Sequence, residues 1–150
     1  SSGLQSNGFS FARKVLFEKM NLDFNDDFNG KPLIETLLTP TNIYVKTFKA
    51  LKDKVVAMAH ITGGGIVENL PRVLPENLRA EVKKDSIKTL PIFDLISKHV
   101  DEDEMYRAFN MGVGMILVVE EKDVDFVLSN AEGSYLIGKI VEGDREAVMV

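Results

Sequence analysis

The sequence contains 150 residues, of which 45% are hydrophobic and 27% are charged, which is enough to bury one substantial core and typical of a single domain. Its 18 basic and 23 acidic residues give a net charge of −5 without any basic run, which argues against binding to nucleic acid. The absence of cysteine excludes disulfides, thiolate zinc sites and a cysteine nucleophile. The longest apolar run, residues 113–119, is far shorter than the roughly 20 residues of a membrane-spanning helix.

The beginning of the chain, SSGLQSNG, lacks an initiator methionine and resembles a loop taken from a longer chain, and we expect no signal peptide there. Apolar residues then recur at helical spacing, which predicts a helix over about residues 8–20 with Ser6 or Asn7 as its N-cap. No carboxylate occurs in this segment before Glu18. The positive end of the helix dipole is thus left for an outside anion, and Ser6, Asn7 and Gly8 are candidate phosphate ligands. An ordinary capped helix explains the same residues.

A loop and a second helix are expected next. Residues 21–31 are rich in Asn and Asp, which favour turns, and predict a surface loop. A helix is expected after Pro40, with Tyr44, Phe48 and Leu51 on a buried face.

The short apolar strand expected at 55–60 leads into His60, three consecutive glycines (Gly63, Gly64 and Gly65) and a short helix. This is the layout of a phosphate cradle, because the first helical N–H groups are unpaired and glycine lets the backbone approach a ligand. The turn lacks the Gly-Lys-Ser/Thr ending of a P-loop and the Gly-x-Gly-x-x-Gly dinucleotide pattern, and such glycines also serve close packing alone. His60 ends the strand and faces a site, although a lone histidine is usually structural.

Strands and helices alternate through the rest of the chain. Residues 78–83 alternate apolar and charged side chains, which predicts an edge or half-exposed strand. Helices are expected from Pro91 and from the acidic run at 101–104, which forms the N-terminal end of the second helix. Four successive helical side chains point in different directions, so the run predicts no metal site. A buried strand at 115–119, a helix at about 122–130 and a further strand follow. The order predicts an α+β fold in which a mixed β-sheet is covered by helices in an α/β layered arrangement.

Four blocks carry a family resemblance: SGLQSNGFS at 2–10, LTPTNIYVK at 38–46, AHITGGGIVENLPRVLP at 59–75 and EMYRAFNMGVGM at 104–115. In this order they closely resemble the C-terminal domain of phosphoribosylformylglycinamidine cyclo-ligases, also called aminoimidazole ribonucleotide synthetases. The resemblance implies that residues 1–150 form such a C-terminal domain, and that an N-terminal ATP-binding and dimerisation domain lies outside this chain.

The activity implied by the resemblance is a step of de novo purine biosynthesis. Enzymes of the family use ATP and Mg²⁺ to activate the formyl oxygen of formylglycinamidine ribonucleotide, after which the amidine nitrogen closes the imidazole ring. The active site lies in the cleft between the two domains, and the N-terminal domain holds most of the ATP and metal machinery. We therefore expect a cytoplasmic homodimer as the complete enzyme, no nucleic-acid or membrane partner, and an inactive isolated fragment.

The chemistry of the residues and the family resemblance indicate the same candidate site. His60 is the candidate catalytic residue, for proton transfer or for polarising the reacting amide. The candidates for binding substrate or phosphate are Ser6, Asn7, Gly8, Thr62, Gly63, Gly64, Gly65, Asn69, Arg72, Arg107 and Asn110. The last four fit equally well as residues that fix a loop or lie behind the site. Gln5 departs from the family, which commonly has histidine there, and glutamine carries no proton at neutral pH, so only a binding role is retained for that position.

Two alternative functions stay open. Related enzymes of the same superfamily make thiamine diphosphate, selenophosphate or a hydrogenase cyanide ligand, and all couple ATP cleavage to activation of an oxygen or similar atom. From a different class, the chain fits a non-catalytic domain that binds phosphate ligands without turnover.

Overall fold

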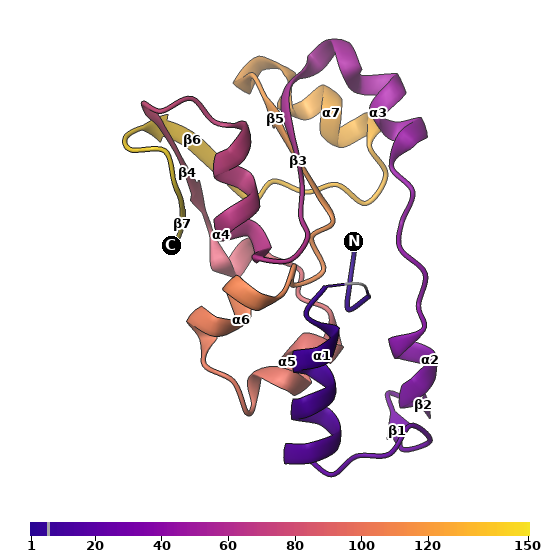
Figure 1. Ribbon diagram of the computed structural model, residues 1–150. Helices are drawn as coiled ribbons and strands as arrows, with labels where there is room; N and C mark the ends of the chain where they lie inside the picture. The colour runs from indigo at the N-terminus through magenta and orange to yellow at the C-terminus, as the bar shows by residue number, and fades with distance from the viewer. Residues whose placement is uncertain (6) are drawn as a thin grey trace.

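The computed structural model describes residues 1–5 and 7–150, which form helices and small β-sheets in the order expected from the sequence (Figure 1). The helices are α1 (Phe9–Arg13, continued by a π-helical turn at Lys14–Lys19), α2 (Leu33–Leu37), α3 (Val45–Leu51), α4 (Gly65–Asn69), α5 (Pro91–Ser97), α6 (Glu102–Ala108) and α7 (Val124–Asn130). The strands are β1 (Asp27–Phe28), β2 (Lys31–Pro32), β3 (Val55–His60), β4 (Leu78–Val82), β5 (Met115–Val119), β6 (Gly138–Glu142) and β7 (Ala147–Met149). The predicted α+β class is confirmed.

The strands divide into three small sheets. β3 pairs with β5 in antiparallel register, with His60 opposite Met115 and Ala59 opposite Ile116. A second sheet has the order β6-β4-β7, in which β4 runs antiparallel to β6 and parallel to β7, so this sheet is mixed as predicted. In Figure 1 the two sheets lie on either side of α4, and α3 and α7 lie beyond β3 and β5.

Of the two expectations for residues 78–83, the half-exposed strand is confirmed and the edge position is wrong. β4 lies in the middle of its sheet, with Ala80 and Val82 buried and Leu78, Arg79 and Glu81 half-exposed. Its alternation arises because only one face of the sheet packs against the core. Both neighbouring strands come from the last part of the chain, and a local pattern cannot show them.

Two local predictions also need correction. The loop at 21–31 contains a short β1–β2 hairpin closed by Asn29 and Gly30, both at positive φ (55° and 85°), which is the turn that an Asn-Gly pair favours. The helix expected after Pro40 begins only at Val45 and buries Leu51, whereas Tyr44 and Phe48 are half-buried.

The main core lies where α1, α4, α5 and α6 meet. Phe109 is buried at its centre, with the rings of Phe11 and Phe93 at centroid distances of 5.7 and 5.4 Å. A smaller core around Leu51 and Val127 fixes α3 and α7 against β3 and β5. These contacts hold the end of β3 and the start of α4, where the candidate site lies.

Candidate functional site

The candidate site forms at the end of β3. The strand alternates, so that Val56, Met58 and His60 are exposed while Ala59 is buried against the core. His60 is therefore presented outward by a strand whose other face is fixed. This confirms the predicted position of His60 at a strand end, and leaves its chemical role as a prediction.

His60 is held by the beginning of the chain. Its Nε2 lies 2.7 Å from the backbone nitrogen of Ser1, which also donates to the carbonyl oxygen of Ile61 at 3.2 Å. Since the Ser1 nitrogen is a donor, Nε2 acts as the acceptor and the ring proton resides on Nδ1. Desolvation lowers the pKa of His60 below its usual 6.5, which favours the neutral ring at pH 7.

Segments far apart in the sequence are tied together next to His60. Ser2 donates its backbone N–H to the Thr41 hydroxyl at 3.3 Å and accepts from the backbone N–H of Asn42 at 2.8 Å. Gln5 donates its side-chain amide to the carbonyl oxygen of Thr39 at 3.1 Å. Residues 1–5 thus join the 38–46 segment to the end of β3, and the Gln5 side chain helps to fix that segment.

Asn110 fixes the same N-terminal segment through buried hydrogen bonds. It is 3% exposed, donates Nδ2 to the carbonyl oxygens of Ser1 (3.0 Å) and Gly3 (2.8 Å), and accepts from the backbone N–H of Gly112. All four blocks of the sequence resemblance therefore converge on one place. Asn110 is occupied by these bonds, which makes it a residue that positions the site.

Asn69 fixes the glycine turn in a similar way. It is 4% exposed, and its Nδ2 donates to the carbonyl oxygens of Gly63 (3.0 Å) and Gly65 (2.7 Å). Its Oδ1 accepts from the Thr62 hydroxyl at 3.3 Å. The side chain of Asn69 is thus directed into the turn, where its bonds fix the backbone of Gly63 and Gly65.

The three glycines of the turn differ in what surrounds them. Gly65 is buried with φ of 60°, and a Cβ there would collide with the carbonyl oxygens of Tyr106 and Phe109. A Cβ on Gly64, at φ of 91°, would collide with the Glu68 side chain. Only Gly63 is exposed, with the Asn7 side chain 3.5 Å from a built Cβ. Close packing accounts for Gly65, and the open part of the turn is at Gly63.

The start of α1 lies against this open side. Its N-cap is Gly8, at φ of 68° and closely covered by the Phe109 ring, so the expectation of Asn7 as the cap is wrong; Ser6, the other candidate cap and ligand, lies outside the described residues. Asn7 instead donates to the Ser1 hydroxyl at 3.1 Å and faces Gly63. The two phosphate sites predicted from the sequence are therefore next to each other.

The two arginine candidates occupy different surroundings. Arg72 is exposed in the 3-10 turn that continues α4, and Arg107 is exposed on α6. Arg107 lines a shallow hollow together with Asp101, Glu102, Asp103 and Glu104, which is an acidic setting unfavourable to phosphate. Within residues 1–5 and 7–150, neither arginine forms an ion pair.

Two residues near the site were not predicted. The Tyr44 hydroxyl packs against Gly114, next to Ser2, so that this glycine provides the close approach. The Glu68 carboxylate lies beside Gly64 at the start of α4. In the sequence, Tyr44 could have been placed near the site because it belongs to the second resembling block. Glu68 could have been placed there because it follows the glycines by one helical turn.

In the part of the chain that the structure describes, no group of three or more His, Asp or Glu side chains is arranged to hold a metal ion. Among the same residues, no helix combines the length and apolar character needed to cross a bilayer.

These features define an α+β domain with an exposed site built from a strand end, a glycine turn and the N-terminal segment. The chain belongs to the family of AIR synthase related proteins, C-terminal domain, whose sequence model matches residues 1–150.

Curated relatives carry the name phosphoribosylformylglycinamidine cyclo-ligase. The chain is 46% identical over 158 residues to that protein from Thermoanaerobacter sp., covering 99% of this chain and 47% of the relative. It is 47% identical over 156 residues to the one from Pseudothermotoga lettingae (99% and 46%), and 46% identical over 154 residues to the one from Bacillus velezensis (96% and 44%). The chain thus spans about half the length of the curated relatives it matches.

Proposed function

We propose that this chain is the C-terminal half of an ATP-dependent cyclo-ligase that converts formylglycinamidine ribonucleotide to aminoimidazole ribonucleotide in purine biosynthesis. The observation that carries the proposal is that the four resembling blocks, distant in sequence, converge around His60 and Gly63. The shared name of relatives at 46% identity supports the same reaction. The N-terminal half of the enzyme is the partner, within a cytoplasmic homodimer.

The phosphate of a nucleotide fits best on the Asn7 side of the glycine turn. Gly63 is exposed there, and without a side chain its backbone can come close to an anion. The Thr62 hydroxyl beside it already donates to Asn69 and helps to fix the turn. On the Gly64 side the Glu68 carboxylate would repel a phosphate. Asn69 and Asn110 contribute by holding the two segments, since their own polar groups are already paired.

His60 is suited to donating a hydrogen bond. Its Nε2 is engaged by the Ser1 nitrogen, so the Nδ1–H is the group with which it would polarise a carbonyl or formyl oxygen. Since its pKa is lowered, it would do so as a neutral imidazole. This favours the polarising role over that of a general base acting through Nε2.

ATP, when bound, supplies the phosphoryl group that turns the formyl oxygen into a leaving group. Among the described residues, the exposed backbone at Gly63 is the part of the turn that fits a phosphate, from a nucleotide substrate or the end of ATP. They do not offer a carboxylate cluster for Mg²⁺, so the metal would be held by the N-terminal half.

The test is complementation in trans. The portion of the Thermoanaerobacter relative outside the matched segment is co-expressed with this chain, and ATP-dependent formation of aminoimidazole ribonucleotide is measured. We expect product only when both parts are present, and a loss of about 100-fold or more for His60→Ala. His60→Asn, whose side-chain amide retains a donor, should recover part of that loss.

Assays with other substrates distinguish the alternative functions. ATP turnover with thiamine monophosphate or selenide would assign another activity of the superfamily. Phosphate or nucleotide binding with no product from any of these substrates, in the presence of both halves, would show a non-catalytic binding domain.

A further inference from the structure

The Tyr44 hydroxyl is a polar group beside the candidate site that has no partner within the described chain. It lies against the backbone of Gly114, at a point where a built Cβ would also come within 3.0 Å of Ser2. Tyr44 is half-buried, and within residues 1–5 and 7–150 its hydroxyl forms no hydrogen bond. Because a tyrosine hydroxyl that packs against the protein usually has a hydrogen-bond partner, this one is suited to a partner group supplied by a ligand.

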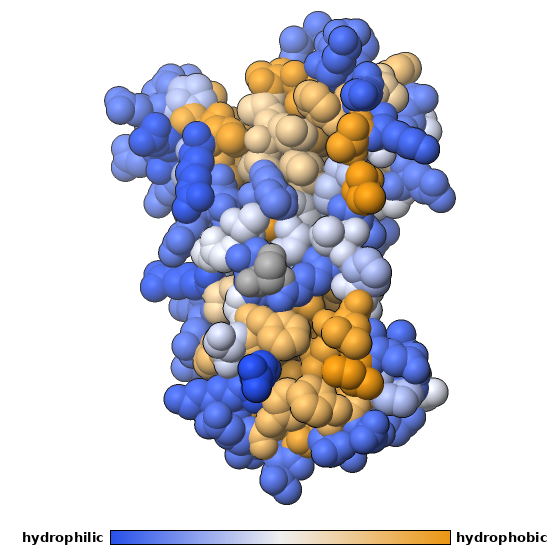
Figure 2. Space-filling model, turned by 45° about the vertical axis from the view of Figure 1, so that its right-hand side comes forward, coloured by the Kyte–Doolittle hydropathy of each residue, from blue (hydrophilic) through white to orange (hydrophobic). Residues whose placement is uncertain are grey.

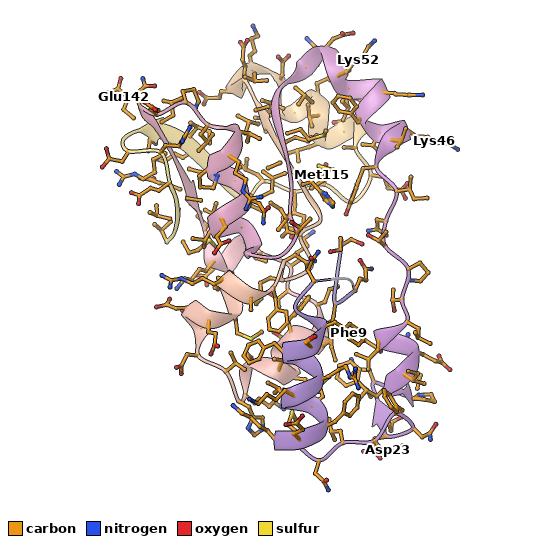
Figure 3. The ribbon with its side chains drawn as sticks, viewed as in Figure 1. Phe9, Asp23, Lys46, Lys52, Met115 and Glu142 are labelled. Carbon is orange, nitrogen blue, oxygen red and sulfur yellow. The ribbon has the colours of Figure 1, made fainter. Side chains whose placement is uncertain are left out.

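Tyr44 reaches from the segment before α3 to the end of the β3–β5 pair. Gly114 directly precedes Met115, which is opposite His60 in the pairing of the two strands. Lys46 and Met115, which are labelled in Figure 3, mark the two segments that Tyr44 connects. A side chain at residue 114 would displace the tyrosine, so the glycine allows this close approach. The hydroxyl therefore lies within one residue step of His60 along the strand pairing.

Three candidate ligand contacts lie along the N-terminal segment in a fixed order. They are Tyr44 beside Ser2, His60 beside Ser1, and Gly63 beside Asn7, whose side chain donates to the Ser1 hydroxyl at 3.1 Å. His60 is in the middle of this series of contacts. Figure 2 shows a pale and polar band at the level of the N-terminal segment, with apolar residues gathered above and below it. The phosphate position proposed at Gly63 and the Tyr44 hydroxyl are thus the two ends of one row of polar contacts.

We propose that Tyr44 binds the formyl-bearing end of the substrate, which is the end remote from its phosphate, by donating a hydrogen bond from its hydroxyl to an oxygen there. With the phosphate at Gly63, the substrate extends past His60 toward Tyr44. A tyrosine hydroxyl is a neutral donor, which suits a formyl or amide oxygen. This inference rests on the proposed function, since that function supplies the substrate.

A contact at this end distinguishes between ligands that share a phosphate. Ribose 5-phosphate carries the phosphate and the sugar but lacks the formyl-bearing end, so it would meet Gly63 and not Tyr44. Removal of the Tyr44 hydroxyl should then weaken binding of the complete substrate alone. A general disturbance of the site would weaken both ligands.

The experiment compares the two ligands on the complex of this chain with the N-terminal portion of the Thermoanaerobacter relative. Calorimetry without ATP gives the dissociation constants of formylglycinamidine ribonucleotide and ribose 5-phosphate, and an assay with ATP gives kcat and KM. The variant is Tyr44→Phe, which keeps the ring and removes only the hydroxyl. Tyr135→Phe is the matched control, because Tyr135 is also half-buried but lies in the loop before β6, where its hydroxyl accepts from the backbone N–H of Lys88 at 3.2 Å. Circular dichroism of each variant establishes that the domain remains folded.

We expect Tyr44→Phe to weaken binding of formylglycinamidine ribonucleotide by about tenfold and to leave ribose 5-phosphate within about twofold of the parent. KM should rise by a similar factor with little change in kcat, since the contact is already made in the bound substrate. Tyr135→Phe should change neither ligand by more than about twofold. Gly63→Ala should weaken both ligands, because both carry the phosphate.

Two results would overturn the assignment of Tyr44. If Tyr44→Phe binds both ligands as tightly as the parent, the hydroxyl meets only water. If the variant weakens both ligands equally, Tyr44 shapes the site and does not bind the formyl-bearing end.

The proposed function is tested separately by product formation. If the parent complex forms aminoimidazole ribonucleotide and Tyr44→Phe behaves like the parent, the function stands and the role of Tyr44 is wrong. If the ligands show the expected contrast but no product forms, Tyr44 binds the substrate as proposed and the function fails. A parent complex that binds neither ligand would overturn both.

Discussion

The region around His60 and the β6-β4-β7 sheet are held together by different means. Around His60, buried Asn110 and Asn69 connect backbone groups of separate segments. In the sheet, β4 pairs with both neighbours through a regular backbone ladder, and its side-chain ion pairs, such as Arg79 with Glu146, are exposed. A ladder tolerates many side chains, whereas the His60 region depends on particular ones. Substitutions of similar size should therefore have very different effects in the two regions.

The largest effect is expected for Gly65→Ala. The residue has φ of 60°, and the new Cβ would press on the carbonyl oxygens of Tyr106 and Phe109, which are backbone atoms of α6 and its end. We expect the free energy of unfolding to fall by about 3 kcal/mol or more, because backbone strain and a clash with rigid atoms add together. Urea unfolding of the purified chain measures this change.

Gly63→Ala is the matched control for the glycine turn. Its Cβ would make only an ordinary contact with Asn7, so we expect a change in the unfolding free energy within about 0.5 kcal/mol. The same variant should weaken phosphate binding, since it narrows the open side of the turn. Equal destabilisation by the two alanines would contradict the different roles assigned to Gly63 and Gly65.

A smaller loss is expected for Asn110→Ala. This change leaves the carbonyl oxygens of Ser1 and Gly3 and the N–H of Gly112 without their buried partner. We expect a loss of about 2–3 kcal/mol in the free energy of unfolding, in keeping with the cost of unpaired buried polar groups. The measurement is again urea unfolding, and hydrogen exchange should show residues 1–5 becoming less protected.

Asn130→Ala provides the comparison for Asn110. Asn130 is exposed at the end of α7 and donates to the carbonyl oxygen of Phe126 at 2.8 Å. Water can replace that bond, so its removal should cost no more than about 0.5 kcal/mol. If both asparagine variants lost the same stability, burial would not be the reason for the importance of Asn110.

The contrast between the His60 region and the β6-β4-β7 sheet also explains which features could be predicted from the sequence. The strand ending at His60 and the helix starting at Pro91 were predicted correctly because their signals are local. The central place of β4 was missed, since its neighbours lie some 60 residues further along the chain. The sequence left two roles open for Asn69 and Asn110, binding a phosphate or fixing a loop, and only their burial and bond partners favour the second.

Smaller still is the pH dependence that His60 contributes to stability. Desolvation in the folded chain lowers its pKa, so the unfolded chain binds the proton more readily. The stabilising contribution is complete above the ordinary pKa of 6.5 and is lost as the pH falls through the lowered value. The variant His60→Asn should therefore show a flatter stability curve between about pH 7.5 and pH 5 than the parent.

The smallest effect is expected in the β6-β4-β7 sheet, for Glu146→Gln. Arg79 donates to Glu146 at 3.1 Å, and both side chains are more than one-third exposed, so solvent screens the pair. Glutamine keeps an acceptor oxygen at the same position, and the loss in the free energy of unfolding should be no more than about 0.5 kcal/mol and should vanish as salt is raised. The buried Nε of Arg79 has no hydrogen-bond partner among the described residues, which means that the guanidinium is fixed by packing as well as by charge. A loss above about 1.5 kcal/mol, unaffected by salt, would show that this ion pair stabilises the sheet as specifically as Asn110 stabilises the site, and the distinction between the two regions would not hold.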